Sequence, residues 1–536
     1  MYSNMKYPIG IQDFKSIIED GYVYVDKTAL VYNMVKNGKI YFLSRPRRFG
    51  KSLLMSTLKY YFMGQRDLFK GLAIEHLEQD WLSYPVFHID FNSTNFEEHD
   101  ALTIKIRKYI SLWEEDYGMK GDAELGIGDR FALLLAHVHK VTGKRCVVLI
   151  DEYDKPLLDV MDSGLSTPNN GVSIEDYNRN VLKSFYSTFK AADEHLQFVL
   201  LTGVTKFSQV SVFSGFNQPN DISMNDKYET LCGVTPEELR HYFKQPIAEM
   251  SRLYDTNEEG MYQLLKQQYD GYHFSSGMTD VFNPFSLLNA LDNQRIDNYW
   301  FKSGTPTYLI RLLKHSNENL NELTGRYYDT SDFIDYKADI ERPLPMIYQS
   351  GYLTIKGYDR KTNMFLLDLP NNEVKKGFLT ALANNYLQTP TPINTELVSM
   401  THALADGNVL LLKQQLTSFF ASIPYTMRRK ENERERERYF HYTFYLLFRL
   451  MSTYTVLTEK AQSEGRADCI IETPHTIYIF EFKLDGTAHD ALCQIEEKGY
   501  ARPYQADKRN LIRIGVSFSS QTGTIEEWET NETSER

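Results

Sequence analysis

The sequence predicts a multidomain α/β protein, and two patterns along the chain carry this prediction. Between residues 40 and 203, short continuous apolar runs alternate with stretches of helical periodicity. Such alternation is typical of a parallel sheet that helices cover on both faces. After residue 430, a helical pattern precedes three strand patterns, a second helix and a fourth strand, which indicates a separate α/β domain.

The expected domains follow the changes in pattern along the chain. A chain of 536 residues is too long for one hydrophobic core, and about three domains are expected. Residues 1–230 hold the parallel sheet, and residues 231–385 are mainly helical, as a lid and connecting domain. Residues 386–430 are expected to be a connector, followed by the C-terminal α/β domain over residues 431–525.

Individual elements are expected where turn residues delimit apolar runs. In the N-terminal domain we expect a helix from Lys51 and strands at Ile40–Leu43, Val86–Phe91, Cys146–Ile150 and Phe198–Leu201. The central part contributes a short aromatic strand at Gly351–Ile355. In the C-terminal domain we expect helix Glu437–Met451, strands Thr453–Thr458, Asp468–Ile471 and Thr476–Phe482, helix Asp490–Tyr500 and strand Leu511–Phe518. Active residues of the parallel sheet are expected where its strands end.

The composition argues against several classes of protein. A formal net charge of -12 argues against a protein that coats nucleic acid non-specifically. The same charge is compatible with a local basic groove that binds nucleic acid. The four cysteines form no CxxC pair, which argues against a zinc ribbon or a thiol redox motif. No signal-peptide pattern begins the chain, and no apolar stretch approaches the roughly 20 residues of a membrane helix. We therefore expect a cytoplasmic protein without a membrane partner.

A phosphate-binding motif follows the first expected strand. The pattern GxxxxGK[ST] is matched in its second half by Gly50-Lys51-Ser52, whereas Arg45 stands where the first glycine would be. In such a loop the backbone N–H groups hold phosphate oxygens, the lysine reaches the terminal phosphates and the serine binds Mg²⁺. A chance Gly-Lys-Ser is the alternative. The expected ATP-binding residues are Arg45, Pro46, Arg47, Arg48, Phe49, Gly50, Lys51 and Ser52.

A second motif supports ATP and Mg²⁺ as cofactors. The apolar strand Cys146–Ile150 runs directly into Asp151 and Glu152. We expect Asp151 to hold Mg²⁺ and Glu152 to polarise the attacking water. Thr202, at the end of the next strand, is expected to contact the terminal phosphate. The alternatives are two acids that only cap a buried strand and an ordinary threonine at a strand end.

These motifs resemble the bacterial AAA-ATPase-like family over residues 5–225. The segments that carry the resemblance are Tyr24–Thr28, Arg45–Ser52, Asp151–Asp154 and Gly203–Ser208. The resemblance implies a P-loop NTPase fold related to AAA and signalling-type ATPases, and a loop with Arg-Pro-Arg-Arg in place of its first glycine. Arg47 or Arg48 then adds positive charge to the phosphate site, unless the two form a solvated basic loop.

The central region also resembles that family, but its motifs suggest no chemistry. The segments concerned are Tyr269–Tyr272, Asn283–Pro284, Tyr299–Trp300, Ser303–Thr305 and Gly351–Thr354. Packing is the favoured interpretation of these segments.

Three charged residues of the C-terminal domain are placed to converge. Glu481 and Lys483 lie two residues apart on one expected strand, so their side chains point to the same face. Asp468 begins the partner strand of the same hairpin. Two carboxylates that bind Mg²⁺, with a lysine beside them, suit the hydrolysis of a phosphodiester. The alternative for each residue alone is a solvated surface charge.

The arrangement resembles the PD-(D/E)XK nuclease superfamily over residues 430–520, with Ala467 where a proline would stand. The resemblance implies a restriction-endonuclease-like domain that acts on nucleic acid, with DNA the expected partner. It adds Glu437 on the first helix and Gln494 on the second as site residues beside the charged cluster. Some domains of this fold keep the acids and only bind.

The sequence therefore predicts an ATPase whose ATP binding or hydrolysis controls a nuclease. Two alternatives stay open: an ATPase with a non-cleaving nucleic-acid-binding domain, and an ATP-switched signalling or scaffold protein with a protein partner. A homo-oligomer is a further alternative. Assembly into a ring would need an arginine finger from a neighbouring copy, and the sequence does not identify one.

Overall fold

In the computed structural model the chain forms two compact units. The first comprises Met1–Trp300 and Gly325–Asn371, and the second comprises Phe301–Thr324 and Asn372–Arg536. The structure describes every residue except 1–4, 162, 169–170, 207–218, 303–322, 335–342, 388–392, 423–442, 445–446, 449, 452–454, 463–464 and 534–536. Each unit contains its own five-stranded sheet. Among the described residues, no helix combines the length and apolar character needed to cross a bilayer.

The large sheet of the first unit is parallel, as predicted. Its strand order is β2-β3-β4-β1-β5, and every neighbouring pair runs parallel. The strands are β1 Ile40–Ser44, β2 Val86–Asp90, β3 Cys146–Asp151, β4 Leu196–Gly203 and β5 Asn220–Asp221. The first four confirm the predicted strands, while the two-residue β5 is too short to leave a pattern in the sequence.

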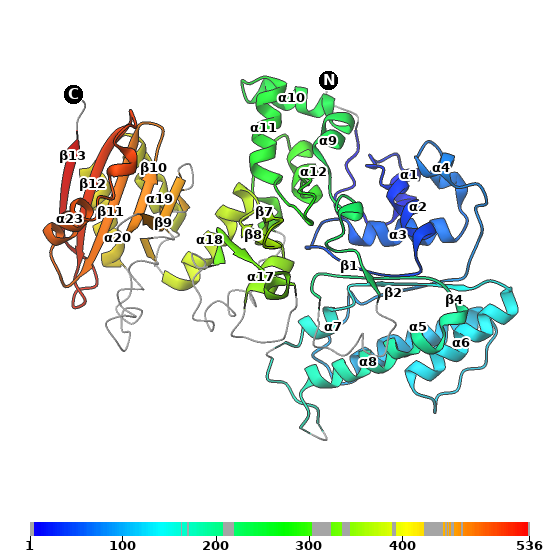
Figure 1. The fold of residues 1–536 in the computed structure, drawn as a ribbon. Helices are drawn as coiled ribbons and strands as arrows, with labels where there is room; N and C mark the ends of the chain where they lie inside the picture. Colours follow the sequence, from blue (N-terminus) through cyan, green and yellow to red (C-terminus); the bar gives the residue numbers. More distant parts are fainter. Residues whose placement is uncertain are drawn as a thin grey trace. The chain divides into compact units, whose positions relative to one another are not determined.

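Helices cover both faces of this sheet (Figure 1). One face carries α1 Phe14–Glu19, α2 Thr28–Asn37 and α3 Lys51–Phe62, and the other carries α5 Ala101–Asp116, α6 Ile127–Thr142 and α8 Ile174–Ala191. Every residue of β3 is buried, which explains why its apolar run is continuous. Because all strands are parallel, the C-terminal ends of β1, β3 and β4 lie at one edge.

The rest of the first unit is a helical subdomain and a small sheet. Its helices are α9 Pro236–Tyr242, α10 Lys244–Leu253, α11 Glu258–Tyr269 and α12 Pro284–Asp292, and they share one apolar core. The small antiparallel sheet has the order β6-β8-β7, formed by Arg326–Tyr328, Met364–Asp368 and Thr354–Asp359. Short helices are α4 Ile74–Leu77, α7 Lys155–Leu158, α13 Tyr299–Lys302, α16 Thr330–Phe333 and α17 Leu344–Gln349.

The strand predicted at Gly351–Ile355 is wrong at its start. The strand there, β7, begins only at Thr354. Gly351 has a φ of 88°, in the left-handed region, and ends the turn after α17. The first three residues of the predicted run therefore form the approach to the strand.

The second unit is built on a mixed sheet of order β13-β12-β11-β10-β9. Only β11 and β12 run parallel, and the other neighbours are antiparallel. The strands are β9 Thr455–Gln462, β10 Gly465–Glu472, β11 Thr476–Leu484, β12 Asn510–Phe518 and β13 Ile525–Thr533. The helices are α18 Asn372–Leu387, α19 Ile393–Ala405, α20 Val409–Ser422 and α23 Ala488–Glu497.

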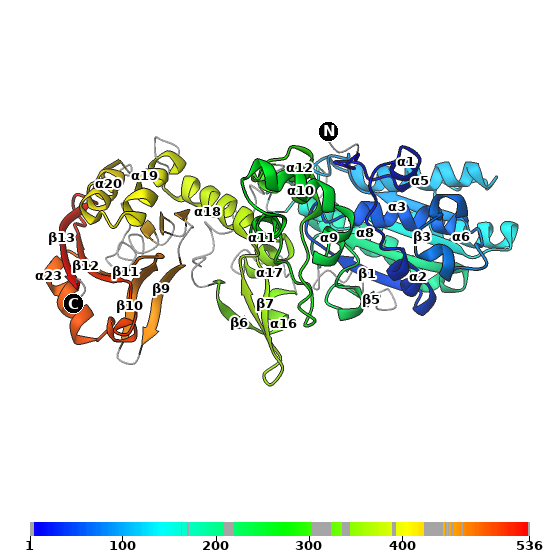
Figure 2. The ribbon, with the colours of Figure 1, turned by 90° about the horizontal axis from the view of Figure 1, so that it is seen from above.

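Different helices cover the two faces of this sheet (Figure 2). Ile477 and Ile479 of β11 share a core with Ile495 of α23. On the opposite face, the hydroxyl of Tyr478 donates to the carbonyl of Leu404 in α19, at 2.8 Å. Since residues alternate along β11, Glu481 lies on the face that α23 covers.

Helix α23 packs very close to the sheet. A Cβ added at Gly515 of β12 would stand 2.1 Å from the carbonyl oxygen of Ala488, at the start of the helix. Strand β13, which the sequence pattern did not predict, forms the outer edge. Its exposed Glu526, Glu527 and Glu529 mask the alternation that would have marked it as a strand.

Candidate functional sites

The phosphate loop connects β1 to α3. Gly50, the N-cap residue of α3, has a φ of 93°, which side chains rarely adopt, and Arg48 has a φ of 70°. No side chain caps this helix. The first N–H groups of an uncapped helix are an anion site, and the positive end of the helix dipole adds to it.

Lys51 turns back onto the loop. Its side chain is 4% exposed, and its Nζ donates to the carbonyls of Arg45, at 3.1 Å, and Pro46, at 3.3 Å. The same Nζ lies 3.6 Å from Oε1 of Glu152. The ammonium is thus held by the first half of the loop and faces the acid that directly follows β3.

The acids at the end of β3 meet the end of β4. The Thr202 hydroxyl donates to Oδ1 of Asp151 at 2.6 Å, and both residues are buried. Glu152 has a φ of 52°, a left-handed conformation that costs about 1–3 kcal/mol unless its surroundings impose it. The structure therefore brings together Lys51, Asp151, Glu152 and Thr202 at one edge of the sheet.

Asp154 is a site residue that the sequence analysis did not single out. It is fully buried, and its Oδ2 accepts from Val204 N at 2.9 Å, Thr205 N at 2.6 Å and the Thr205 hydroxyl at 2.7 Å. Burial and the nearby Glu152 raise the pKa of Asp154 to about 6. Asp154 thereby ties the turn after β3 to the end of β4. The signal in the sequence was the second aspartate of Asp-Glu-Tyr-Asp.

Arg45 points into the protein interior. Its guanidinium donates to the carbonyls of Ser44 at 2.9 Å, Ser223 at 2.7 Å and Tyr228 at 3.2 Å. It also lies 4.2 Å from the ring centre of Phe274. This arrangement favours a role in anchoring the loop, and the expected phosphate contact of Arg45 stays a prediction.

The other loop residues divide into exposed and buried ones. Arg47 and Arg48 are exposed, and the Arg48 guanidinium lies 5.0 Å from the ring centre of Phe285. Pro46 and Phe49 are buried, and Ser52 is half-buried on the first turn of α3. Only the two exposed arginines present free charge at the surface of the loop.

The predicted nuclease residues converge on α23 and the β10–β11 hairpin. The backbone N–H of Phe482 donates to Oδ2 of Asp468 at 2.8 Å, which holds Asp468 beside β11. The Gln494 amide nitrogen donates to Oε1 of Glu481, and its oxygen accepts from Lys483 Nζ. Lys483 Nζ lies 3.9 Å from Oε1 of Glu481. Four of the five predicted residues are thus brought together.

The electrostatics of this cluster fit a divalent cation. Glu481 is 2% exposed, and its burial together with the charge of Asp468 raises its pKa to about 8. A bound cation would offset the cost of ionising the buried Glu481 beside Asp468. The described residues contain no group of three or more His, Cys, Asp or Glu placed to hold a metal. Glu437, the expected further acid, lies outside the described residues.

Comparison with family models gives two matches. Residues 8–213 match the model described as "Predicted AAA-ATPase", and residues 435–528 match a model of the PD-(D/E)XK nuclease superfamily. The two matches confirm the predicted fusion of the two domains.

Known proteins add one close relative and several remote structures. The Aeropyrum pernix ORC1 protein in complex with DNA is 11% identical, over 68% of this chain and 95% of that one, with a TM-score of 0.24. The Aeropyrum pernix ORC2 protein is also 11% identical, over 66% and 93%, with a TM-score of 0.26. TM-scores this low do not establish a shared fold.

The relative is a protein of Azotobacter chroococcum mcd 1, named as an uncharacterized protein in the vnfD 5' region. It is 34% identical over 529 residues, which cover 98% of each chain. With a relative over nearly its whole length and a match to each domain, the chain belongs to the family of AAA-ATPase-like proteins that carry a C-terminal domain of the PD-(D/E)XK nuclease superfamily.

Proposed function

We propose that the chain is an ATPase whose nucleotide state controls a Mg²⁺-dependent nuclease in its second unit. The observation that carries the nuclease is the cluster of Asp468, Glu481, Lys483 and Gln494, in which the Gln494 amide joins the buried Glu481 to Lys483 and Asp468 lies beside them. The ion pair between the buried Lys51 and the half-buried Glu152, beside Asp151, supports the ATPase.

In the first unit, each residue has a distinct proposed task. The N–H groups at the start of α3 and the Lys51 ammonium bind the phosphates. Ser52 and Asp151 hold Mg²⁺, which would neutralise phosphate charge. Glu152 orients and polarises the attacking water, and Thr202 holds Asp151 and contacts the terminal phosphate.

In the second unit, Asp468 and Glu481 hold Mg²⁺, which would neutralise the phosphodiester and acidify a bound water. Lys483 orients that water or stabilises the negative charge that develops on the phosphate. Gln494 fixes the side chains of Lys483 and Glu481 relative to each other through its two hydrogen bonds. Glu437 remains part of the proposal as an additional acid.

The proposal extends to the setting of the protein. The substrate is nucleic acid, with DNA as the first choice, and homo-oligomers stay possible. The domain limits 1–230, 231–385, 386–430 and 431–525 are part of the proposal. A cytoplasmic location agrees with the four cysteines, which are all free thiols.

The decisive experiment is a cleavage assay on single- and double-stranded DNA and RNA with Mg²⁺ or Mn²⁺, with and without ATP. The wild type is compared with Asp468→Ala, Glu481→Gln and Lys483→Ala, and with Lys498→Ala, an exposed residue at the end of α23, as matched control. Cleavage by the wild type and the control alone supports the nuclease. If nothing is cut but nucleic acid binds, the domain is a binding module; equal cleavage by all variants refutes the assignment.

A further inference from the structure

The segment Tyr269–Phe274 lies between the phosphate loop and the small sheet. Two of its side chains, Tyr272 and Phe274, pack against Phe49 of the loop, with ring centres 4.8 Å and 5.3 Å away. Phe274 also lies under the Arg45 guanidinium. One side of this segment is therefore in direct contact with the phosphate loop, and a shift of the loop would move it.

A second contact joins the same parts. The Tyr272 hydroxyl donates to the carbonyl of Gly351 at 3.2 Å. Gly351 in turn lies against Pro46, because a Cβ added there would stand 2.7 Å from the proline Cβ. Arg45, Pro46 and Phe49 of the loop are thus all in contact with the segment or with its hydrogen-bonded neighbour.

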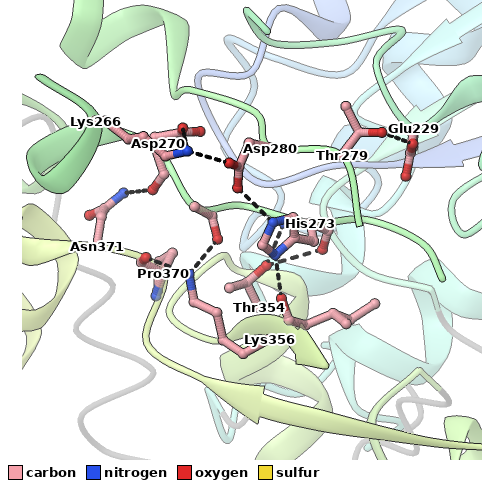
Figure 3. Close-up of polar contacts among 12 residues, drawn as sticks. Glu229, Lys266, Asp270, His273, Thr279, Asp280, Thr354, Lys356, Pro370 and Asn371 are labelled. Atoms are coloured by element: carbon pink, nitrogen blue, oxygen red, sulfur yellow. Dashed lines mark hydrogen bonds and ion pairs between the residues drawn. The ribbon is translucent and has the colours of Figure 1, made fainter. Parts of the chain in front are cut away.

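The other side of the segment is bonded to β7. The backbone N–H of His273 donates to the Thr354 hydroxyl at 2.9 Å, and that hydroxyl donates back to the His273 carbonyl at 3.0 Å. Lys356 Nζ donates to the carbonyls of Gly271, at 2.7 Å, and Pro370, at 2.8 Å. Figure 3 shows the lysine between these two carbonyls.

The bonded residues lead directly to the end of the first unit. The Asn371 side-chain amide donates to the carbonyl of Asp270 at 2.9 Å. Asn371 is the last residue of the first unit, and α18 of the second unit begins at Asn372. The segment therefore fixes Pro370 and Asn371, where the chain leaves the ATPase.

The charges around the segment are incompletely paired (Figure 3). Asp270 is 1% exposed, and the nearest cation to its carboxylate is Lys266 Nζ, in a long ion pair of 3.9 Å. Asp280 takes both Lys266 and His273, each at 2.7 Å. Burial raises the pKa of Asp270 to about 7 and lowers that of Lys356. Because separating a buried charge from its partner is strongly unfavourable, the charged residues of this network constrain one another.

Lys51 connects the phosphate site to these contacts of the loop. Its Nζ bonds the carbonyls of Arg45 and Pro46, whose side chains contact Phe274 and Gly351. Phosphate binding requires the same ammonium. Nucleotide must therefore compete with these two carbonyls, and the first half of the loop is released or shifted.

We propose that the segment Tyr269–Phe274 couples the nucleotide state of the phosphate loop to Pro370–Asn371, through the Phe49 contacts on one side and Lys356 on the other. The inference rests on the proposed ATP site and adds the route by which that site acts on the rest of the chain. Coupling of this kind is reciprocal, so the same contacts tune nucleotide affinity.

Hydrogen exchange on the full chain tests the coupling. In the wild type, ATP with Mg²⁺ should change the exchange rates of residues 354–371 by about 5-fold or more. Lys356→Met keeps the apolar stem and removes the ammonium, and it should bind ATP yet lose this response. Lys361→Met, at an exposed position on the β7–β8 turn, should respond as the wild type does.

The outcomes separate the two proposals. A wild type that fails to bind ATP overturns the ATP site and this coupling together. A wild type that binds ATP without a change at residues 354–371, or a Lys356→Met variant with the full response, overturns the coupling alone. If Lys356→Met does not fold, Tyr272→Phe decides: it keeps the ring against Phe49, loses the bond to Gly351, and should reduce the response, whereas an unchanged response refutes the route.

Discussion

Glu481 and Lys483 form only a long ion pair, and the side chain of Gln494 bridges them, donating to the acid and accepting from the ammonium. Their own closest approach is 3.9 Å. This relationship makes Gln494 the residue that sets the distance between Glu481, the proposed metal ligand, and the Lys483 ammonium.

Gln494→Leu should therefore impair cleavage without unfolding the domain. Loss of both hydrogen bonds frees Glu481 and Lys483, and residues that orient metal ligands typically change activity or metal affinity by about 10–100-fold. The measurement is the cleavage rate as a function of Mg²⁺ concentration, with exposed Glu497→Ala on the same helix as control. An unchanged Mg²⁺ dependence would contradict this role.

The stability of the metal-free protein should fall as pH rises toward about 8, the raised pKa of Glu481. A carboxyl whose pKa is raised by folding binds more protons in the folded state, so its contribution is complete below its ordinary pKa of 4.5 and is lost through the folded value. Thermal unfolding between pH 5 and about 8.5 measures this loss. Glu481→Gln should flatten the profile, and Mg²⁺ should restore stability at the alkaline end. A wild-type profile that matches Glu481→Gln would refute the prediction.

Two substitutions should separate ATP binding from hydrolysis. Lys51→Ala removes the buried ammonium and should abolish binding of ATP. Glu152→Gln keeps the shape of the site, so ATP should still bind while hydrolysis slows by about 10²–10⁴-fold, the usual worth of a general base. Calorimetry and phosphate release measure the two effects, and Lys70→Ala at the exposed surface is the control. Tight binding by Lys51→Ala would move the ATP site elsewhere.

Asp154→Asn should weaken both the fold and hydrolysis. In the asparagine, either the amide NH₂ faces the backbone N–H donors of Val204 and Thr205 and repels them, or its oxygen accepts from them as a neutral and weaker acceptor. An unsatisfied buried group costs about 1–3 kcal/mol. Denaturant unfolding gives the loss of stability, and ATP turnover gives the effect on the site. Asp159→Asn, whose partly exposed carboxylate pairs with Lys155, should behave as wild type in both assays.

The sequence predicted the elements whose pattern is local. The continuous apolar residues of β3 require burial on both faces, and a parallel sheet then brings the strand ends together, so the neighbourhood of Asp151 and Thr202 followed from the pattern. The alternation along β11 likewise placed Glu481 and Lys483 on one face.

The partners of Arg45 and Phe49 could not be predicted in the same way. Arg45 donates to a carbonyl 183 residues further along the chain, and Phe49 packs on Tyr272. Nothing in the local sequence distinguishes an arginine that faces phosphate from one that faces carbonyls. The choice is made by the tertiary packing of the helical subdomain.

Strand β13 has a consequence for how the second unit behaves in concentrated solution. A nine-residue strand at the rim of a sheet offers unpaired backbone groups to the same strand of another copy. The exposed, negatively charged Glu526, Glu527 and Glu529 repel such a copy. Neutral residues at these three positions would therefore remove the barrier to sheet-to-sheet association, and such variants should aggregate more readily than the wild type at high protein concentration.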